Sequence, residues 1–128
     1  MPVEPVPTPS APGAKGPYSP AVRAGDWIVL AGQVGLDPAT GTLVEGIEAQ
    51  ARQVMANIAA ILGDCGAALT DVAKATVFLT DMGDFPAVNE AYAAAFAGHL
   101  PARTTIGVAA LPVGAEVEIE VLAYQPQT

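Results

Sequence analysis

The end of the chain carries the pattern that restricts the fold most. Residues 104–111 are small or apolar at almost every position, and Pro112 and Gly114 then indicate a turn. Between residues 116 and 124, aliphatic side chains and carboxylates alternate, which is typical of a β-strand with one buried face. The two segments therefore predict a terminal β-hairpin, in which the residues of one strand lie beside those of the other.

Arg103 stands directly before the first of these strands and is one of only 5 Lys or Arg residues in a chain of net charge -8. A lone cation in so acidic a protein needs either a carboxylate partner or an anionic ligand. In a hairpin, Arg103 and Glu118 can flank one small space. The residues alone leave two interpretations open, a structural ion pair and a site for a small anion.

The strand over residues 104–111 is apolar on both of its faces, and such a strand needs cover on both. The helices predicted below can cover only one face of a sheet. Charged residues make up 14% of the chain, whereas typical soluble domains carry roughly 25%. We therefore expect another subunit to cover the second face and Glu118 to lie between subunits.

The remaining elements follow from apolar periodicity and turn residues. Three further strands are predicted, at residues 21–24, 27–31 and 72–79. One amphipathic helix is predicted over residues 47–62, and a second begins near Asp84 as its N-cap. The order β-β-α-β-α-β-β predicts an α+β fold with two helices on one face of the sheet, in one domain over residues 16–128.

Residues 1–15 are rich in proline and have no apolar period. This composition predicts an extended or disordered N-terminal arm that is not a packed element. No apolar run approaches the ~18 residues that a membrane span needs, and the start lacks the basic and apolar regions of a signal peptide. We therefore expect no membrane contact and a cytoplasmic location.

The acidic balance and the scarcity of Cys and His exclude several kinds of site. Binding of nucleic-acid phosphates needs clustered Lys and Arg, whereas the cations here are spread along the chain. The single cysteine, Cys65, and the single histidine, His99, provide neither a disulfide nor a metal cluster. Both are predicted at helix ends, as structural residues.

Short motifs recur along the chain: Gly16-Pro17-Tyr18-Ser19, Gly32-Gln33, Asp37-Pro38 through Gly41, Gln50 with Asn57-Ile58, Asp71-Val72 with Thr76-Val77-Phe78, Asp84-Phe85 with Val88-Asn89 and Tyr92, Pro101-Ala102-Arg103-Thr104, Leu111-Pro112, and Glu118-Ile119-Glu120. In this order and spacing they resemble the reactive intermediate deaminases, the Rid family, once called YjgF-like. The resemblance covers nearly the whole chain, from Gly16 to Ala123.

The resemblance implies a fold similar to that of a trimeric chorismate mutase, with a mixed sheet, two helices on one face and three subunits around a barrel-like centre. It implies hydrolysis of reactive 2-imino acids, such as 2-iminobutanoate and 2-iminopropanoate, or of their enamine tautomers, to 2-keto acids and ammonia. It also implies active sites in the clefts between subunits, with no metal and no cofactor.

The resemblance assigns catalytic roles to the two residues singled out above. Arg103 matches the family arginine that holds the substrate carboxylate, and a guanidinium fork suits a planar carboxylate better than an ammonium does. Glu118 matches the carboxylate that positions or activates water beside the imine carbon. Glu120 shares the face of Glu118, where a solvated or interface carboxylate is the simpler interpretation.

The resemblance also implies a set of substrate-binding residues. Tyr18 matches a tyrosine near the ligand, although a tyrosine that caps a core edge is the structural alternative. Backbone groups at Gly32 and Thr105 match groups that contact substrate, and Asn89 is similar to an asparagine near the pocket. Two departures, Ala31 in place of serine and Thr105 in place of cysteine, bear on substrate preference and rate more than on reaction type.

A function of another class is compatible with the same resemblance. The alternative to an enzyme is a trimeric module that binds small carboxylates or acts as a chaperone. Family members have also been described as ribonucleases, an activity that the charge of -8 disfavours here. The enzyme interpretation requires Arg103, whereas a chaperone activity would survive its loss.

Overall fold

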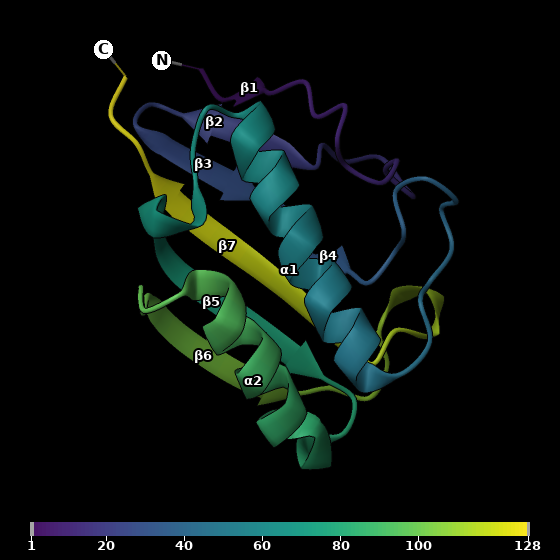
Figure 1. Ribbon diagram of the computed structural model, residues 1–128. Helices are drawn as coiled ribbons and strands as arrows, with labels where there is room; N and C mark the ends of the chain where they lie inside the picture. Colours follow the sequence, from purple (N-terminus) through teal and green to yellow (C-terminus); the bar gives the residue numbers. More distant parts are fainter. Residues whose placement is uncertain (1, 128) are drawn as a thin grey trace.

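Two helices cover one face of a seven-stranded mixed β-sheet (Figure 1). The computed structural model describes residues 2–127. The helices are α1 (Ile47–Asp64) and α2 (Phe85–Phe96). The strands are β1 (Glu4–Pro5), β2 (Ala21–Ala24), β3 (Trp27–Leu30), β4 (Gln33–Val34), β5 (Val72–Leu79), β6 (Ala102–Gly107) and β7 (Val117–Tyr124). The predicted α+β order is confirmed, with the short strands β1 and β4 in addition.

The order of the strands in the sheet is β1-β2-β3-β7-β5-β6, and β4 also pairs with β7. The predicted terminal hairpin is wrong, because β5 lies between β6 and β7. The chain passes from β5 through α2 to β6 as a crossover, which makes β6 parallel to β5. The connection over residues 108–116 then carries the chain past β5, so that β7 pairs between β3 and β5.

The edge strand β6 begins and ends earlier than predicted. It spans Ala102–Gly107 instead of residues 104–111, and just beyond it the Val108 amide donates to the Leu79 carbonyl at 2.8 Å. Arg103 therefore lies inside the outermost strand of the sheet and not before it. One side of this strand pairs with β5, and the other side has no strand beside it in the described residues.

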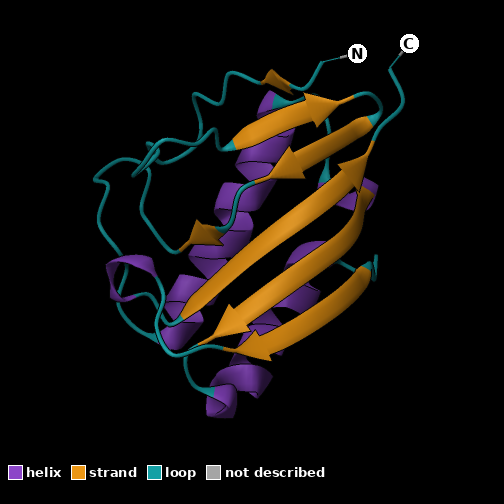
Figure 2. Cartoon of the chain, turned by 180° about the vertical axis from the view of Figure 1, so that it is seen from behind, coloured by secondary structure: helices purple, strands orange, loops and turns teal. Residues whose placement is uncertain are grey.

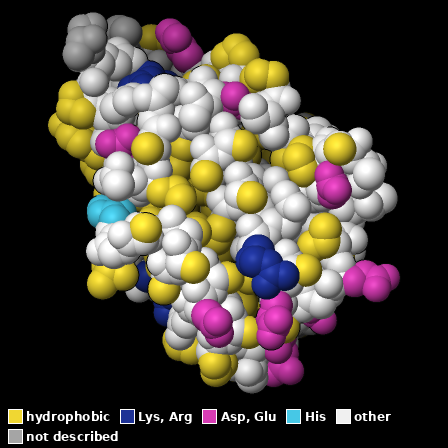
Figure 3. Space-filling model, viewed as in Figure 1, with side chains coloured by type: hydrophobic (Ala, Val, Ile, Leu, Met, Phe, Trp, Pro, Cys, Tyr) yellow, Lys and Arg dark blue, Asp and Glu magenta, His cyan; other side chains and the backbone are white. Residues whose placement is uncertain are grey.

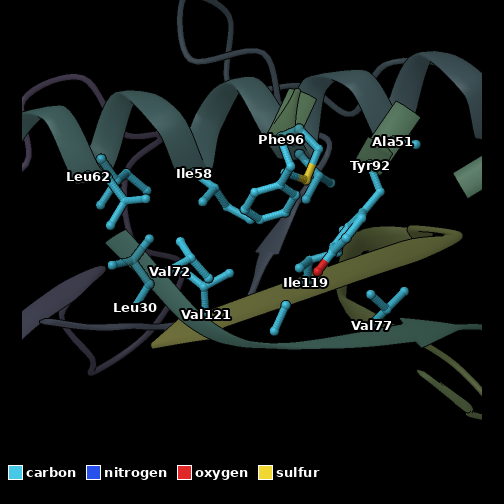
Figure 4. Close-up of a cluster of buried hydrophobic side chains, with 14 of the residues drawn as sticks. Leu30, Ala51, Ile58, Leu62, Val72, Val77, Tyr92, Phe96, Ile119 and Val121 are labelled. Carbon is cyan, nitrogen blue, oxygen red and sulfur yellow. The ribbon is translucent and has the colours of Figure 1, made fainter. Parts of the chain in front are cut away.

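The hydrophobic core lies between the helices and the sheet (Figure 4). The inward-facing residues of β7 form its centre and are at most 2% exposed: Val117, Ile119, Val121 and Ala123. The inner face of α1 packs on them with Val54, Ile58, Ile61 and Leu62. Full burial of such aliphatic side chains stabilises the fold by about 1.5–3 kcal/mol each. Within residues 2–127, no helix has the length and apolarity needed to cross a membrane.

The opposite face of the sheet has no helix over it (Figure 2). Large apolar side chains are exposed there: Trp27 (41%), Ile106 (42%), Leu122 (37%) and Tyr124 (45%). The rings of Trp27 and Tyr124 pack edge to face, with centroids 5.0 Å apart. An exposed apolar surface of this kind is typical of a protein–protein contact.

The N-terminal arm is extended as predicted, but the expectation that it is not packed is wrong. β1 pairs with β2, and the Val6 amide donates to the Ala21 carbonyl at 3.0 Å (Figure 1, purple). The Ser10 amide and hydroxyl both donate to the Asp64 carboxylate, at 2.9 and 2.8 Å. Proline tolerates this position because an edge strand leaves half of its backbone donors unused.

We therefore expect deletion of residues 1–11 to destabilise the protein by about 2–3 kcal/mol, because it removes the β1 pairing, the apolar contacts of Val6 and Ala11 and the bonds to Asp64. Urea unfolding measures this loss. Ser10→Ala is the matched control, since it removes only the hydroxyl bond and should cost about 0.5–1.5 kcal/mol. An unchanged midpoint in the truncated chain would contradict a structural role for the arm.

Candidate functional site

Within one chain, the two predicted catalytic side chains lie on opposite faces of the sheet. Arg103 is in register with Ala75 of β5, which is buried beneath the helices. Glu118 is in register with Phe78, which lies three residues after Ala75 on β5. Because successive side chains of a strand point to opposite faces, Phe78 and Glu118 face the open side of the sheet. The expectation that Arg103 and Glu118 flank one space is wrong for a single chain. An ion pair between them inside one chain is excluded for the same reason.

Arg103 lies between the edge strand and α2, against two aromatic rings. Its guanidinium carbon is 4.9 Å from the ring centroid of Tyr92 and 5.4 Å from that of Phe85. Cation–π contacts of this kind orient the guanidinium without neutralising its charge. Thr105 shares this side of β6, and the half-buried Asn89 lies one helical turn after Phe85 on α2. Three residues of the predicted site, Arg103, Thr105 and Asn89, thus lie on β6 and α2 on the helix side of the sheet. Tyr92, which was predicted as a core residue, supports the Arg103 guanidinium.

Glu118 lies at the start of β7, where β4 pairs beside it through Val34. Its carboxyl group packs directly on Gly32. A Cβ atom added to Gly32 would lie 2.8 Å from the Glu118 carboxyl carbon, closer than real contacts allow. Glycine leaves room for the Glu118 carboxyl group in this position, and a larger residue would displace that carboxyl group. The predicted proximity of Gly32 to the site is therefore explained by a steric constraint.

A small pocket opens beside Glu118, and the N-terminal arm forms one wall of it. Tyr18 lines this wall, 50% exposed, and its hydroxyl accepts a hydrogen bond from the Lys15 amide at 3.3 Å. The other walls come from β4 and from the turn before β7, with these lining residues: Gln33, Val34, Leu36, Pro112 and Val113. The fold thus brings together Tyr18, Gly32 and Glu118 from distant parts of the sequence.

The environment of Glu118 favours its protonated form. Burial raises the pKa of the Glu118 carboxyl above its ordinary value, and the charge of Glu120 on the same face adds to this shift. A carboxylate with a raised pKa is a stronger base than an exposed one. Glu120, which is exposed, therefore acts on Glu118 through its charge.

Two buried amide side chains of α1 hold the backbone around this pocket. The Asn57 side chain is 2% exposed and donates to the carbonyls of Leu36 (2.8 Å) and Val34 (3.4 Å). The Gln50 side chain is 3% exposed and accepts from the Glu116 amide at 2.9 Å. Sequence analysis assigned no role to either residue. The signal in the sequence that could have identified them is a pair of side-chain amides, seven residues apart, on the apolar face of the predicted helix.

A larger hollow lies on the outer surface between α1 and α2, where Figure 3 shows hydrophobic side chains along a valley. Its volume is about 580 Å³, and alanines, Met55 and Leu69 form most of its lining. Its charged side chains are Glu48, Arg52 and Glu90. It contains none of the predicted site residues, so the candidate site remains at Glu118 and Arg103.

The endoribonuclease L-PSP family matches residues 8–125 of the chain. The chain belongs to this family. It is 50% identical over 119 residues to the 2-iminobutanoate/2-iminopropanoate deaminase of Mus musculus, with 92% of this chain and 88% of the relative covered. RidA from a Psychrobacter species has a TM-score of 0.91 at 47% identity, covering 93% of this chain and 97% of that one. E. coli TdcF with bound serine has a TM-score of 0.91 at 37% identity, covering 95% and 98%.

These relatives confirm the resemblance to the Rid family and the implied fold of the single chain, a mixed sheet with two helices on one face. The family match includes the second half of the arm, from residue 8, together with strands β2 to β7 of the sheet. The roles of the individual residues stay predictions: Tyr18, Gly32, Asn89, Arg103, Thr105 and Glu118. Their placement in two groups on opposite sides of the sheet is the structural fact that any function must explain.

The contact between Gly32 and Glu118 provides a direct test of the pocket. Gly32→Ala should push the Glu118 carboxyl toward solvent, since the added methyl group and the carboxyl carbon cannot share one position. The pKa of Glu118 should then fall toward the ordinary value of about 4.3, as measured by carboxyl carbon NMR. Gly63→Ala is the control, because nothing lies within 4 Å of its added Cβ. An unshifted Glu118 pKa in Gly32→Ala would contradict this account of the site.

Proposed function

We propose that this protein hydrolyses 2-imino acids, or their enamine tautomers, to 2-keto acids and ammonia. In this proposal it acts in the cytoplasm as a homotrimer, without a cofactor, at sites between subunits. The observation that carries the proposal is the placement of Arg103 and Glu118 on opposite faces of one sheet. Each chain then holds one half of two different sites. The deaminase from Mus musculus supports the reaction, and serine bound to TdcF supports a small carboxylate ligand.

The exposed surfaces support an assembly that completes the site. The open face of the sheet carries exposed aromatic and aliphatic residues, and Glu118 lies on that same face. Arg103 lies on the strand at the free edge of the sheet. A neighbouring copy whose edge strand packs beside the open face brings its Arg103 toward Glu118. This contact joins two different surfaces of the chain, so it can repeat from copy to copy around a ring, and we propose a closed ring of three.

In this site Arg103 holds the substrate. A guanidinium presents two parallel N–H groups that match the two oxygens of the 2-carboxylate. Its stacking on Phe85 and Tyr92 limits its orientation before substrate binds. Asn89 and Thr105 lie on the same side and provide polar groups for the bound acid. The carboxylate is thereby fixed with the imine carbon directed at the opposite half of the site.

Glu118 then activates a water molecule as a general base. The imine reacts in its protonated form. The Glu118 carboxylate takes a proton from a water molecule while the water oxygen bonds to the imine carbon, and the electron pair of the carbon–nitrogen double bond moves to the nitrogen, which becomes a neutral amine. The protonated Glu118 gives its proton to this amine, the carbon–nitrogen bond breaks, and ammonia leaves. The hydroxyl group loses its proton to Glu118 as the keto group forms, and this proton replaces the one that the imine brought to the site. The sum is one imine and one water to one keto acid and one ammonia. The raised pKa of Glu118 suits both proton transfers, and Tyr18 and the Gly32 backbone border the reacting atoms.

The name of the family raises RNA as another substrate, and the charge distribution argues against it. The net charge is -8, and the cations are dispersed at Lys15, Arg23, Arg52, Lys74 and Arg103. A nucleic-acid site needs such residues grouped along the phosphate backbone. We therefore propose a small imino acid as substrate and no nucleic-acid partner.

Substitutions in the two halves of the site should have different effects. Arg103→Ala should abolish detectable binding of pyruvate in calorimetry and lower kcat/KM about a hundredfold or more, because a charge-assisted bidentate contact is lost. Arg103→Lys should recover little of this. Glu118→Gln should retain pyruvate binding and lose turnover, since an amide does not accept the water proton. The loss of wild-type activity toward low pH should follow the raised pKa of Glu118.

A structural role for either residue predicts the opposite pattern. The catalytic assignment would be contradicted if the variants had reduced melting temperatures and lost binding and turnover in parallel. Retained pyruvate binding in Arg103→Ala would favour a binding module or chaperone function instead. Turnover is measured by making the imine in solution with an amino-acid oxidase, with semicarbazide as the competing trap.

A mixture of two inactive variants tests whether the site is shared. Refolding equal amounts of Arg103→Ala and Glu118→Gln chains together should restore about a quarter of the sites, because a site is intact when one chain supplies Glu118 and its neighbour Arg103. Each variant refolded alone is the control. Light scattering should give about three times the 12.9 kDa chain mass for all samples. A monomer, or a mixture as inactive as its components, would refute the shared site.

A further inference from the structure

One cationic residue, the exposed Lys15, lines the Glu118 pocket and has no role in the mechanism above. Lys15 lines the wall that the N-terminal arm contributes, together with Tyr18. The hydrogen bond from its backbone amide to the Tyr18 hydroxyl, at 3.3 Å, ties this part of the arm to the pocket. In a chain with 13 acidic residues and only 5 Lys or Arg, a lysine beside the proposed base is unexpected unless it binds an anion.

The other cations with recorded contacts are held by the protein itself. Arg23 donates to the backbone carbonyls of Gly25 and Gln125, and Lys74 donates to the Thr104 hydroxyl at 2.8 Å. Arg103 rests on two aromatic rings. Lys15 differs because it lines the pocket that contains Glu118, whereas Arg52 lines the separate hollow between α1 and α2.

The Lys15 ammonium does not neutralise Glu118. A cation paired with a carboxylate lowers the pKa of that carboxyl group, whereas the pKa of Glu118 is raised by burial and by Glu120. The Glu118 carboxyl is instead packed on Gly32, on the floor of the pocket. The ammonium of Lys15 is therefore available to a ligand that enters between the arm and β4.

We propose that Lys15 makes this site selective for 2-imino acids that carry a second carboxylate on the side chain. The inference rests on the proposed function. With the 2-carboxylate on Arg103 of a neighbouring copy and the imine carbon at Glu118, the substrate side chain extends toward the arm, where Lys15 meets its terminal carboxylate. The two cations of the site then match the two carboxylates of the substrate. The reaction is unchanged: the imine and water yield a keto dicarboxylic acid and ammonia.

A comparison of two substrates tests this selectivity. Imines made in solution from glutamate and from 2-aminobutanoate by amino-acid oxidases provide a dicarboxylic and a monocarboxylic substrate. Lys15→Met, which keeps the length of the side chain and removes its charge, should lower the ratio of kcat/KM for the dicarboxylic over the monocarboxylic imine about tenfold. Lys15→Arg should restore the ratio. Arg52→Met removes one charge on the outer face of α1, away from the pocket, and should leave the ratio unchanged.

Binding of the keto-acid products separates the inference from the proposed function. Calorimetry with 2-oxoglutarate and 2-oxobutanoate should show the same change of preference in Lys15→Met, whether or not the imines are hydrolysed. Turnover of both imines with a ratio and a binding preference that do not depend on Lys15 would overturn the inference and leave the proposed function standing. A Lys15-dependent binding preference without imine hydrolysis would support the inference and refute the deaminase function.

Discussion

The pairing of β7 with strands on both of its sides is the interaction on which the rest of the structure depends. β7 bonds to β3 and β4 along one edge and to β5 along the other, so it occupies the middle of the sheet. Its inward residues form the centre of the core under α1, and its outward residues carry the carboxylates, including Glu118. Successive side chains of a strand point to opposite faces of the sheet. One face of β7 therefore contributes to the core, and the other carries the base of the proposed site.

The raised pKa of Glu118 comes from burial more than from the charge of its neighbour Glu120. The carboxyl group is pressed onto the backbone at Gly32, and the buried amides of Asn57 and Gln50 hold the surrounding chain. These contacts limit access of water to the carboxyl group, which raises its pKa. The arm completes this environment, because Tyr18 closes the pocket and β1 anchors the arm to the sheet. The arm thus forms part of the fold and lines the pocket of the proposed site.

The same geometry accounts for a proposed active site that forms only when copies of this small chain, which has few charges, assemble. The helices cover one face of the sheet, and the apolar open face requires another partner. In the proposed trimer, the contact that hides this face also joins the arginine of one chain to the glutamate of the next. Stability of the assembly and completion of the site are then coupled, so a change at the interface affects both.

The sequence by itself determined most of the local elements, and its resemblance to the Rid family nominated the residues of the proposed site. β5 and the start of α1 were predicted to the residue, because the periodicity of apolar side chains is set within each segment. Which strands are neighbours was decided only by the tertiary structure: the crossover through α2 placed β5 between β6 and β7, and no local pattern records that choice. Glu118 was therefore predicted correctly as a strand residue, Arg103 was wrongly placed before its strand, and the two were wrongly predicted as neighbours within one chain. The face that each side chain takes depends on strand register, which long-range packing alone establishes.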